Sequence, residues 1–116
     1  MALHHLAFRT HDLEALARFY GEVFGWEVYR QQGERAVWFR LGAGVLMLEL
    51  AAPGEKEIPA GSKELFCVAM PENERQSFRR KLAGLQVDVE DETEFTLYFR
   101  DPDGRRVGVS SYRFEP

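Results

Sequence analysis

The segment Leu3-His4-His5-Leu6-Ala7-Phe8-Arg9 decides the fold, because it begins a unit that occurs twice in the chain. Apolar and polar residues alternate along it, which is typical of a strand with one buried face. Leu6 and Phe8 share the apolar side, while His5 and Arg9 share the other. We therefore expect a strand with one apolar face and one face that carries ionisable side chains.

The same pattern returns when the chain is shifted against itself by 59 positions without a gap. This shift places His5 on Glu64 and Glu49 on Gly108. Further matches between the two halves are Leu6 with Leu65, Phe19 with Phe78, Gly25 with Gly84 and Val28 with Val87. Self-similarity of this kind indicates two copies of one unit of about 55 to 60 residues.

Each half predicts the element order β-α-β-β-β. In the first half, Asp12 is a plausible N-cap for a helix that runs to Gly25. Alternation and turn residues then predict strands at Trp26–Arg30, Arg35–Leu41 and Val45–Ala51. The second half predicts a strand at Lys63–Met70, a helix at Asn73–Ala83 and strands at Leu85–Val89, Phe95–Arg100 and Arg105–Tyr112.

The predicted fold class is α+β, in a single domain over residues 1–116. The chain of 116 residues is too short for two independent domains of typical size. The repeats cover about 1–52 and 62–116, and the segment 53–61 has the composition of a connector. Two paired β-α-β-β-β units can form a curved mixed sheet, a cup or half-barrel with helices outside, and its concave side would be the ligand site.

Composition excludes several classes of function. A net charge of -4 and a pI near 5.4 argue against binding of nucleic acid. No apolar run approaches the length of about 18 residues that suggests a membrane span. The lone Cys67 indicates a reducing compartment, so we expect a cytoplasmic protein. Neither Cys67 nor Ser110-Ser111 has an evident base or elbow motif, which argues against nucleophilic catalysis.

Two motifs resemble those of the vicinal oxygen chelate superfamily. The first is His5-x-x-x-Arg9-x-x-Asp12-Leu13, followed by Phe19-Tyr20 and Phe24-Gly25-Trp26; the second is Phe99-Arg100-Asp101-Pro102-Asp103-Gly104. The superfamily includes glyoxalase I, bleomycin-resistance proteins, fosfomycin-modifying enzymes and extradiol dioxygenases. The resemblance implies paired β-α-β-β-β units and a homodimer, but one fold hosts many functions.

The resemblance also implies candidate metal ligands. His5 and Glu49 match ligand positions, whereas Glu64 replaces a second-half His and Gly108 replaces a Glu. One imidazole and two carboxylates would suit Ni, Zn, Mn or Fe. Glu64 could be a third ligand or a general base, so Glu49 and Glu64 are the candidate catalytic residues. The alternatives are an ion pair of Glu49 with Arg9 or Arg40, and a solvated charge at Glu64.

Candidate substrate-binding residues are Arg9, Trp38, Arg40, Tyr98 and Arg100. Arg9 matches an Arg that contacts the glutathione carboxylate in glyoxalase I, and Tyr98 matches a Tyr that contacts substrate in fosfomycin-modifying enzymes. By alternation, Trp38 shares a strand face with Arg40, and Tyr98 shares one with Arg100. An aromatic wall with guanidinium groups would hold a planar or anionic small molecule. Alternatively, Trp38 fills the core.

Two functions remain open at this point. The first is a metal-dependent lyase, transferase or dioxygenase that polarises adjacent substrate oxygens, and His5 with Glu49 favours it. The second is a metal-free protein that sequesters or senses a small ligand, as bleomycin-resistance members do. Gly108 and the missing second-half His favour this second function.

Overall fold

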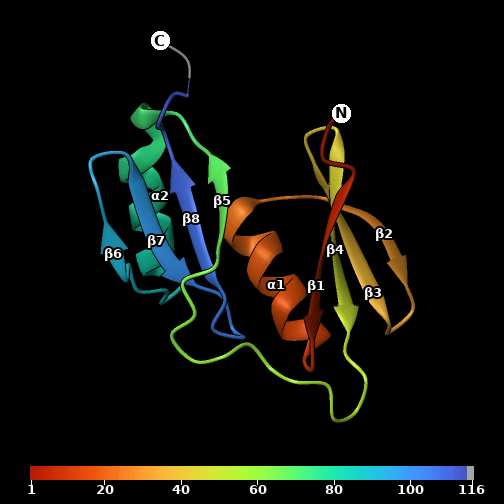
Figure 1. The fold of residues 1–116 in the computed structure, drawn as a ribbon. Helices are drawn as coiled ribbons and strands as arrows, with labels where there is room; N and C mark the ends of the chain where they lie inside the picture. The colour runs from red at the N-terminus through yellow and green to blue at the C-terminus, as the bar shows by residue number, and fades with distance from the viewer. Residues whose placement is uncertain (115–116) are drawn as a thin grey trace. The chain divides into compact units, whose positions relative to one another are not determined.

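The computed structural model describes residues 1–114, and the chain divides into two compact units. Unit 1 is Met1–Glu57, and unit 2 begins at Ile58. Figure 1 draws unit 1 in red to yellow-green and unit 2 in green to blue. No helix among the described residues is long and apolar enough to span a membrane.

Unit 1 contains one helix and a four-stranded sheet, which we name sheet A. Its elements are β1 (His5–Thr10), α1 (Leu13–Phe24), β2 (Val28–Gln32), β3 (Ala36–Leu41) and β4 (Gly44–Leu50). The strand order is β1-β4-β3-β2. β1 pairs with β4 in parallel, and the other pairs are antiparallel.

Local sequence sets both ends of α1. The Asp12 side chain accepts a hydrogen bond from the backbone N–H of Ala15, which caps one of the free donors of the first turn. Gly25 ends the helix in the left-handed conformation at φ 68°, and its N–H donates to the Gly21 carbonyl. A glycine adopts this conformation without steric cost.

The core of unit 1 lies between α1 and one face of sheet A. Leu16 and Tyr20 of α1 are fully buried, as are Phe39 of β3 and Leu46 of β4. The Tyr20 ring lies 6.0 Å from that of Phe8 on β1. Burial of each such side chain contributes about 1.5–3 kcal/mol, so this face of the sheet is fixed by packing. The opposite face carries both apolar and polar residues.

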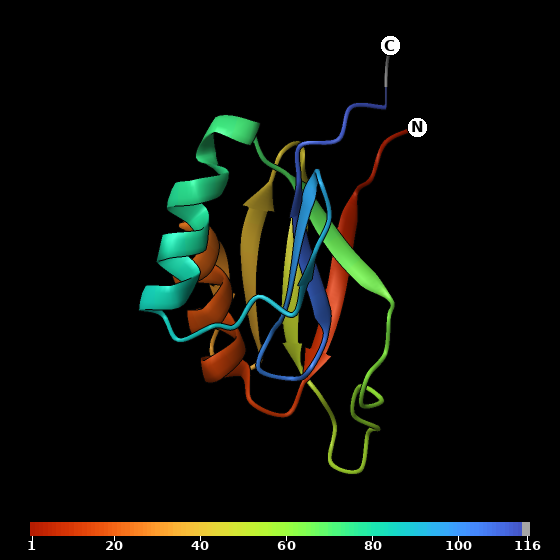
Figure 2. The same ribbon diagram turned by 90° about the vertical axis from the view of Figure 1, so that its left-hand side faces the viewer.

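Unit 2 repeats this order with one added turn, which confirms the expected pair of β-α-β-β-β units. Its elements are β5 (Leu65–Ala69), the 3-10 turn η1 (Glu72–Glu74), α2 (Arg75–Gly84), β6 (Asp91–Glu92), β7 (Thr96–Arg100) and β8 (Arg106–Ser110). The strand order of this sheet B is β5-β8-β7-β6. Phe78 of α2 packs on Phe99 of β7, and Figure 2 shows α2 on one side of the strands of unit 2.

The strand expected at Leu85–Val89 is not formed, and β6 is only Asp91–Glu92. The N–H groups after α2 close the helix instead. Gln86 has φ 59°, its N–H donates to Ala83, and the N–H of Val87 donates to Leu82. This is the Schellman motif, here with Gln in the left-handed position. Val87, which the sequence pattern assigned to a strand, therefore helps to cap α2 instead.

The Asp101-Pro102-Asp103-Gly104 turn is a buried scaffold. Asp101 is 4% exposed and accepts hydrogen bonds from the backbone N–H groups of Asp103 and Arg105. The Arg105 guanidinium lies 2.7 Å from the other Asp101 oxygen. A buried carboxylate requires such partners, so Asp101 holds the turn between β7 and β8.

Strand pairing corrects the internal register that the gapless shift suggested. Trp38 pairs with Met47 in sheet A, and its counterpart Tyr98 pairs with Gly108 in sheet B. Gly108 therefore corresponds to Met47 and not to Glu49. In the same way, His5 corresponds to Leu65, because both are the first residues of their strands and pair with Val45 and Arg106.

The offset of β8 has a further cause in the turn between the last two strands, which is longer in unit 2. Gly42 and Ala43 join β3 to β4, whereas residues 101–105 join β7 to β8. A slip of one residue moves a side chain to the other face of a strand. Glu64, which the shift placed on His5, lies before β5 begins, and this difference arises before the longer turn is reached.

Candidate functional site

The candidate site is the face of sheet A that α1 does not cover, which we call the helix-free face. Alternation and register place on it every second residue of each strand. These residues are His5, Ala7 and Arg9 of β1, Val45, Met47 and Glu49 of β4, Ala36, Trp38 and Arg40 of β3, and Arg30 and Gln32 of β2. Five of the residues singled out from the sequence thus share this face: His5, Arg9, Trp38, Arg40 and Glu49.

His5 lies at the start of β1 and is exposed. Its Nδ1 lies 2.9 Å from Nδ1 of His4, and its strand partner is Val45. Only one of two imidazole nitrogens in such a contact can carry the proton, so the two rings share one hydrogen bond. The His5 imidazole is accessible to a ligand.

Glu49 lies at the other end of the same face, next to Arg9. Its carboxylate is 3.5 Å from the Arg9 guanidinium, which is one of the two ion pairs considered from the sequence. Arg9 also donates to both oxygens of Glu55, over 3.0 and 2.9 Å. Arg9 is therefore held by two carboxylates of its own unit.

Glu55 anchors the segment after β4 to β1. Besides Arg9, its carboxylate accepts a hydrogen bond from the backbone N–H of Ala52. The Arg9 hydrogen bonds and the Ala52 hydrogen bond lower the pKa of Glu55 from 4.5 to about 2. The same contacts raise the pKa of Arg9, so the pair stays charged at neutral pH.

The three candidate metal ligands do not converge within a unit. His5 pairs with Val45 and Glu49 pairs with Arg9, so four strand positions separate them, about 13 Å at the usual rise. Glu64 lies in unit 2, is exposed, and precedes β5. Across residues 1–114, no three His, Cys, Asp or Glu side chains are grouped so as to hold a metal ion.

The hairpin of β2 and β3 carries an aromatic and cationic cluster. The Arg30 guanidinium lies over the Trp38 ring at 5.4 Å from its centre, and the Arg40 guanidinium lies over the Tyr29 ring at 4.1 Å. The Trp38 Nε1 atom is shielded from solvent and has no hydrogen-bond partner among the described residues. Because Trp38 pairs with Arg30 and Met47, it belongs to the helix-free face and not to the core between sheet and helix.

Two arginines of sheet B, in contrast, face carboxylates of their own unit. Arg106 lies over the Tyr98 ring at 4.1 Å, but it also approaches Glu90 at 3.4 Å. Arg100, the counterpart of Arg40, donates to both oxygens of Glu90 over 3.0 Å. The hydrogen bonds from Arg100, with the nearby Arg106, lower the pKa of Glu90.

Arg100 also has a structural role. Its Nη1 atom donates to the carbonyl groups of Ser62, at 2.5 Å, and Gly104, at 3.1 Å. These contacts join the segment before β5 to the turn before β8. The guanidinium expected to bind substrate is thus engaged on several sides by its own unit.

Cys67 lies on β5 opposite Gly108 and is a free thiol. Partial burial raises its pKa, so the nucleophilic thiolate is scarce at neutral pH. This agrees with the expectation that Cys67 is not a nucleophile.

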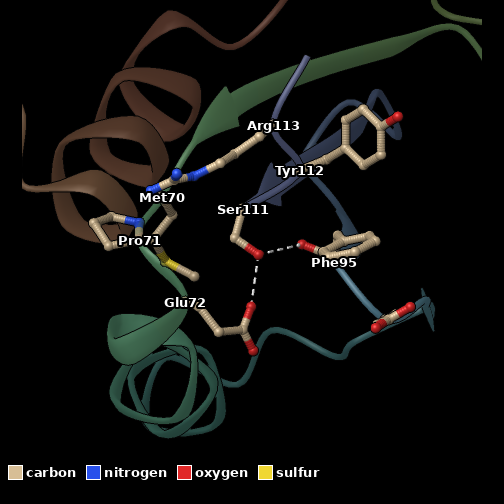
Figure 3. A pocket seen from close by; sticks show the side chains of 8 residues that line it. Met70, Pro71, Glu72, Phe95, Ser111, Tyr112 and Arg113 are labelled. Carbon is tan, nitrogen blue, oxygen red and sulfur yellow. Dashed lines mark hydrogen bonds between the residues drawn. The ribbon is translucent and has the colours of Figure 1, made fainter. Parts of the chain in front are cut away.

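Unit 2 has a pocket of about 640 Å³ that the sequence did not predict. Figure 3 shows the Ser111 hydroxyl between the Glu72 carboxylate and the Phe95 carbonyl, at 2.6 and 3.4 Å. The Ser111 hydroxyl and the Glu72 carboxylate are therefore hydrogen-bond partners of each other. The pocket is lined by Met70, Pro71, Glu72, Glu94, Phe95, Ser111, Tyr112 and Arg113.

Sequence reasoning missed Tyr29, Arg30, Glu55 and Glu90. Tyr29 and Arg30 are adjacent, so simple alternation would place them on opposite faces. Their common role depends on a break in the β2–β3 register between Val28 and Arg30. Glu55 and Glu90 lie in segments without periodicity, and only the folded chain shows which arginine each one meets.

Comparison with known proteins agrees with this fold. The family model described as Glyoxalase/Bleomycin resistance protein/Dioxygenase superfamily matches residues 2–109. A crystal structure of lactoylglutathione lyase from Agrobacterium tumefaciens is similar to this chain, with 28% identity and a TM-score of 0.75, covering 94% of this chain and 92% of that one.

Fosfomycin resistance protein FosX from Listeria monocytogenes has a TM-score of 0.85 at 15% identity, covering 98% of this chain and 93% of that one. A mutant FosX from the same organism, complexed with Mn(II) and 1S,2S-dihydroxypropylphosphonic acid, has a TM-score of 0.82 at 16% identity, covering 98% and 92%. At this identity the likeness to FosX concerns the fold alone. The family model, which spans most of the chain, establishes that this protein belongs to the glyoxalase, bleomycin resistance protein and dioxygenase superfamily.

Proposed function

We propose that this protein binds a small anionic molecule on the helix-free face of sheet A, as a ligand-sequestering or ligand-sensing member of its superfamily. One observation carries the proposal. Arg30 and Arg40 lie on this face beside aromatic rings, and within residues 1–114 neither has a carboxylate partner. Two uncompensated cations on one surface attract an anion.

The contrast between the two sheets supports this choice. Arg100 and Arg106 of sheet B share the carboxylate of Glu90, and Arg106 also lies 3.8 Å from Asp91, so that surface carries little net positive charge. Arg40 has the position of Arg100 but rests on a Tyr ring instead. A guanidinium on an aromatic ring stays available for a planar carboxylate, which it can bind through two parallel hydrogen bonds.

A metal ion is the cofactor that the superfamily suggests, since the FosX complex contains Mn(II). The donors of this chain do not fit one within either unit, because His5 and Glu49 are four strand positions apart and Glu49 faces Arg9. The proposed ligand binding therefore uses side chains of the protein alone.

A second candidate is a metal-dependent lyase, transferase or dioxygenase. The accessible His5 imidazole and the 28% identity to a lactoylglutathione lyase favour it. In this alternative His5, Glu49 and Glu64 would hold Ni, Zn, Mn or Fe, which would polarise adjacent substrate oxygens.

Elemental analysis separates the two candidates. Untagged protein purified without chelator, with His5→Ala and Glu49→Ala variants beside it, should contain no stoichiometric divalent ion, and adding Mn, Ni, Fe or Zn should not load one. Benzoate should bind equally well before and after treatment with chelator. About one ion per chain, lost in both variants, would establish the metal-dependent alternative instead.

A further inference from the structure

We infer that the anion-binding centre of the helix-free face is the β2–β3 hairpin, with Arg30 and Arg40 as its two cations, and that it selects planar dianions such as aromatic dicarboxylates. This inference rests on the proposed function and deepens it. It assigns no binding role to Arg9, the arginine of β1 on the same face.

Arg9 differs from the hairpin arginines in its partners. Glu55 accepts from two of its nitrogens at 3.0 and 2.9 Å, and Glu49 lies 3.5 Å away. The Glu55 carboxylate thus occupies the position that a ligand carboxylate would take. An incoming anion would have to displace it and would meet the negative charge of Glu49 nearby.

The hairpin arginines are oriented by rings. Arg40 stacks on Tyr29 at 4.1 Å, and Arg30 lies over Trp38 at 5.4 Å. Stacking leaves the edges of a guanidinium, which carry its N–H groups, free to donate. It also limits the rotamers of a long side chain before a ligand arrives, which reduces the entropy lost on binding.

A β-bulge makes this arrangement possible. Val28 pairs with Phe39, but the next paired residue of β2 is Arg30, opposite Trp38, so Tyr29 is the extra residue. A bulge re-aims side chains that alternation would separate. Here it lets the adjacent residues Tyr29 and Arg30 both serve the helix-free face, where Arg40 and Trp38 lie.

The spacing of the cations defines the ligand class. Trp38 and Arg40 are two residues apart on β3, about 7 Å, and Arg30 lies opposite Trp38. Each guanidinium covers its own ring, Trp38 or Tyr29, so the hairpin presents two cations at neighbouring positions. A ligand with one carboxylate pairs with one cation, whereas a dicarboxylate pairs with both.

Isothermal titration with isophthalate, benzoate and benzylamine tests the inference. Wild-type protein should bind isophthalate more tightly than benzoate and should not bind benzylamine. Arg30→Gln and Arg40→Gln should each weaken isophthalate binding about tenfold and remove most of the preference for it over benzoate. Arg40→Lys, which keeps the charge but not the planar donor, should lie between wild type and Arg40→Gln.

Two further variants provide the comparison. Arg80→Gln makes the same charge change at an exposed position of α2, outside the hairpin, and should leave the affinity within about twofold. Arg9→Gln should also have only a small effect. Circular dichroism of each variant checks that the exposed substitutions leave the fold unchanged.

Two results would overturn the inference; the first leaves the proposed function intact, and the second overturns it as well. If wild type binds isophthalate but the loss follows Arg9→Gln and not the hairpin variants, the assignment to the hairpin is wrong while the proposed function stands. If wild type binds neither isophthalate nor benzoate, the inference and the proposed function both fail.

Discussion

Arg9 and Glu55 lie 46 residues apart in the chain and form an ion pair with two hydrogen bonds. The Glu55 carboxylate also accepts a hydrogen bond from the backbone N–H of Ala52. One carboxylate thus closes the turn after β4 and fixes it to β1. At the scale of single residues, this contact decides which arginines of the helix-free face are available. It gives Glu55 a structural role in place of a surface charge.

The Glu55 carboxyl should titrate well below the usual range. Its pKa in the folded protein is about 2, against 4.5 for the unperturbed group, so its contribution to stability is full above about pH 4.5. As the pH falls, that contribution decreases and is lost near pH 2. Carbon-detected NMR of the side-chain carboxyl should show a midpoint near 2, and a midpoint near 4.5 would contradict the ion pair.

The Glu55→Gln variant tests the same contact through stability. It should be less stable than wild type at neutral pH, and the difference in free energy of unfolding should shrink as the pH is lowered toward 2. Glu57→Gln, an exposed neighbour for which no such partner is described, is the matched control. A constant difference across this pH range would show that the charge of Glu55 is not what stabilises the turn.

At the scale of elements, the close approach of β5, β7 and β8 favours a glycine at position 108. A Cβ atom there would lie 3.2 Å from the Cys67 sulfur and 3.2 Å from the Leu97 carbonyl oxygen. The first of these can shift, but the second belongs to the backbone of β7. Packing between the strands thus explains a glycine at position 108, whether or not a metal ligand is missing there.

Gly108→Ala should therefore destabilise unit 2 by about 1–2 kcal/mol, since overpacking outweighs the entropic benefit of alanine. Gly84→Ala is the control, because a Cβ at Gly84 would meet no atom within 4 Å. Thermal unfolding should show a lower midpoint for the first variant only. An unchanged or higher midpoint for Gly108→Ala would mean that the strands can move apart without cost.

The element order could be predicted from the sequence because helical and strand periodicities are local signals. The face assignments within unit 1 followed from the same alternation, which correctly placed Trp38 and Arg40 together. The correspondence between the two repeats could not be read in this way, because their offset changes along the chain, as at the longer turn before β8, without an apolar signature. The bulge at Tyr29 could not be predicted either, because one extra residue in a strand does not change the apolar pattern in a recognisable way.

At the scale of the whole molecule, each sheet ends in strands with one paired neighbour: β1 and β2 in sheet A, β5 and β6 in sheet B. Such edges present unpaired backbone groups and invite further pairing. Together with the family resemblance, this leads us to propose a homodimer. Sedimentation velocity at micromolar concentration should give a mass of about two chains of 13.4 kDa, and a single-chain mass would contradict the dimer.

The central claim is that the first unit binds a small anion with its own side chains. Amide chemical-shift mapping with isophthalate, on ¹⁵N-labelled protein treated with chelator, tests it most directly. We predict saturable shifts concentrated in β2 and β3, around Tyr29, Arg30 and Trp38. Shifts confined to the unit 2 pocket around Ser111, or shifts that appear only after a divalent ion is added, would contradict the account.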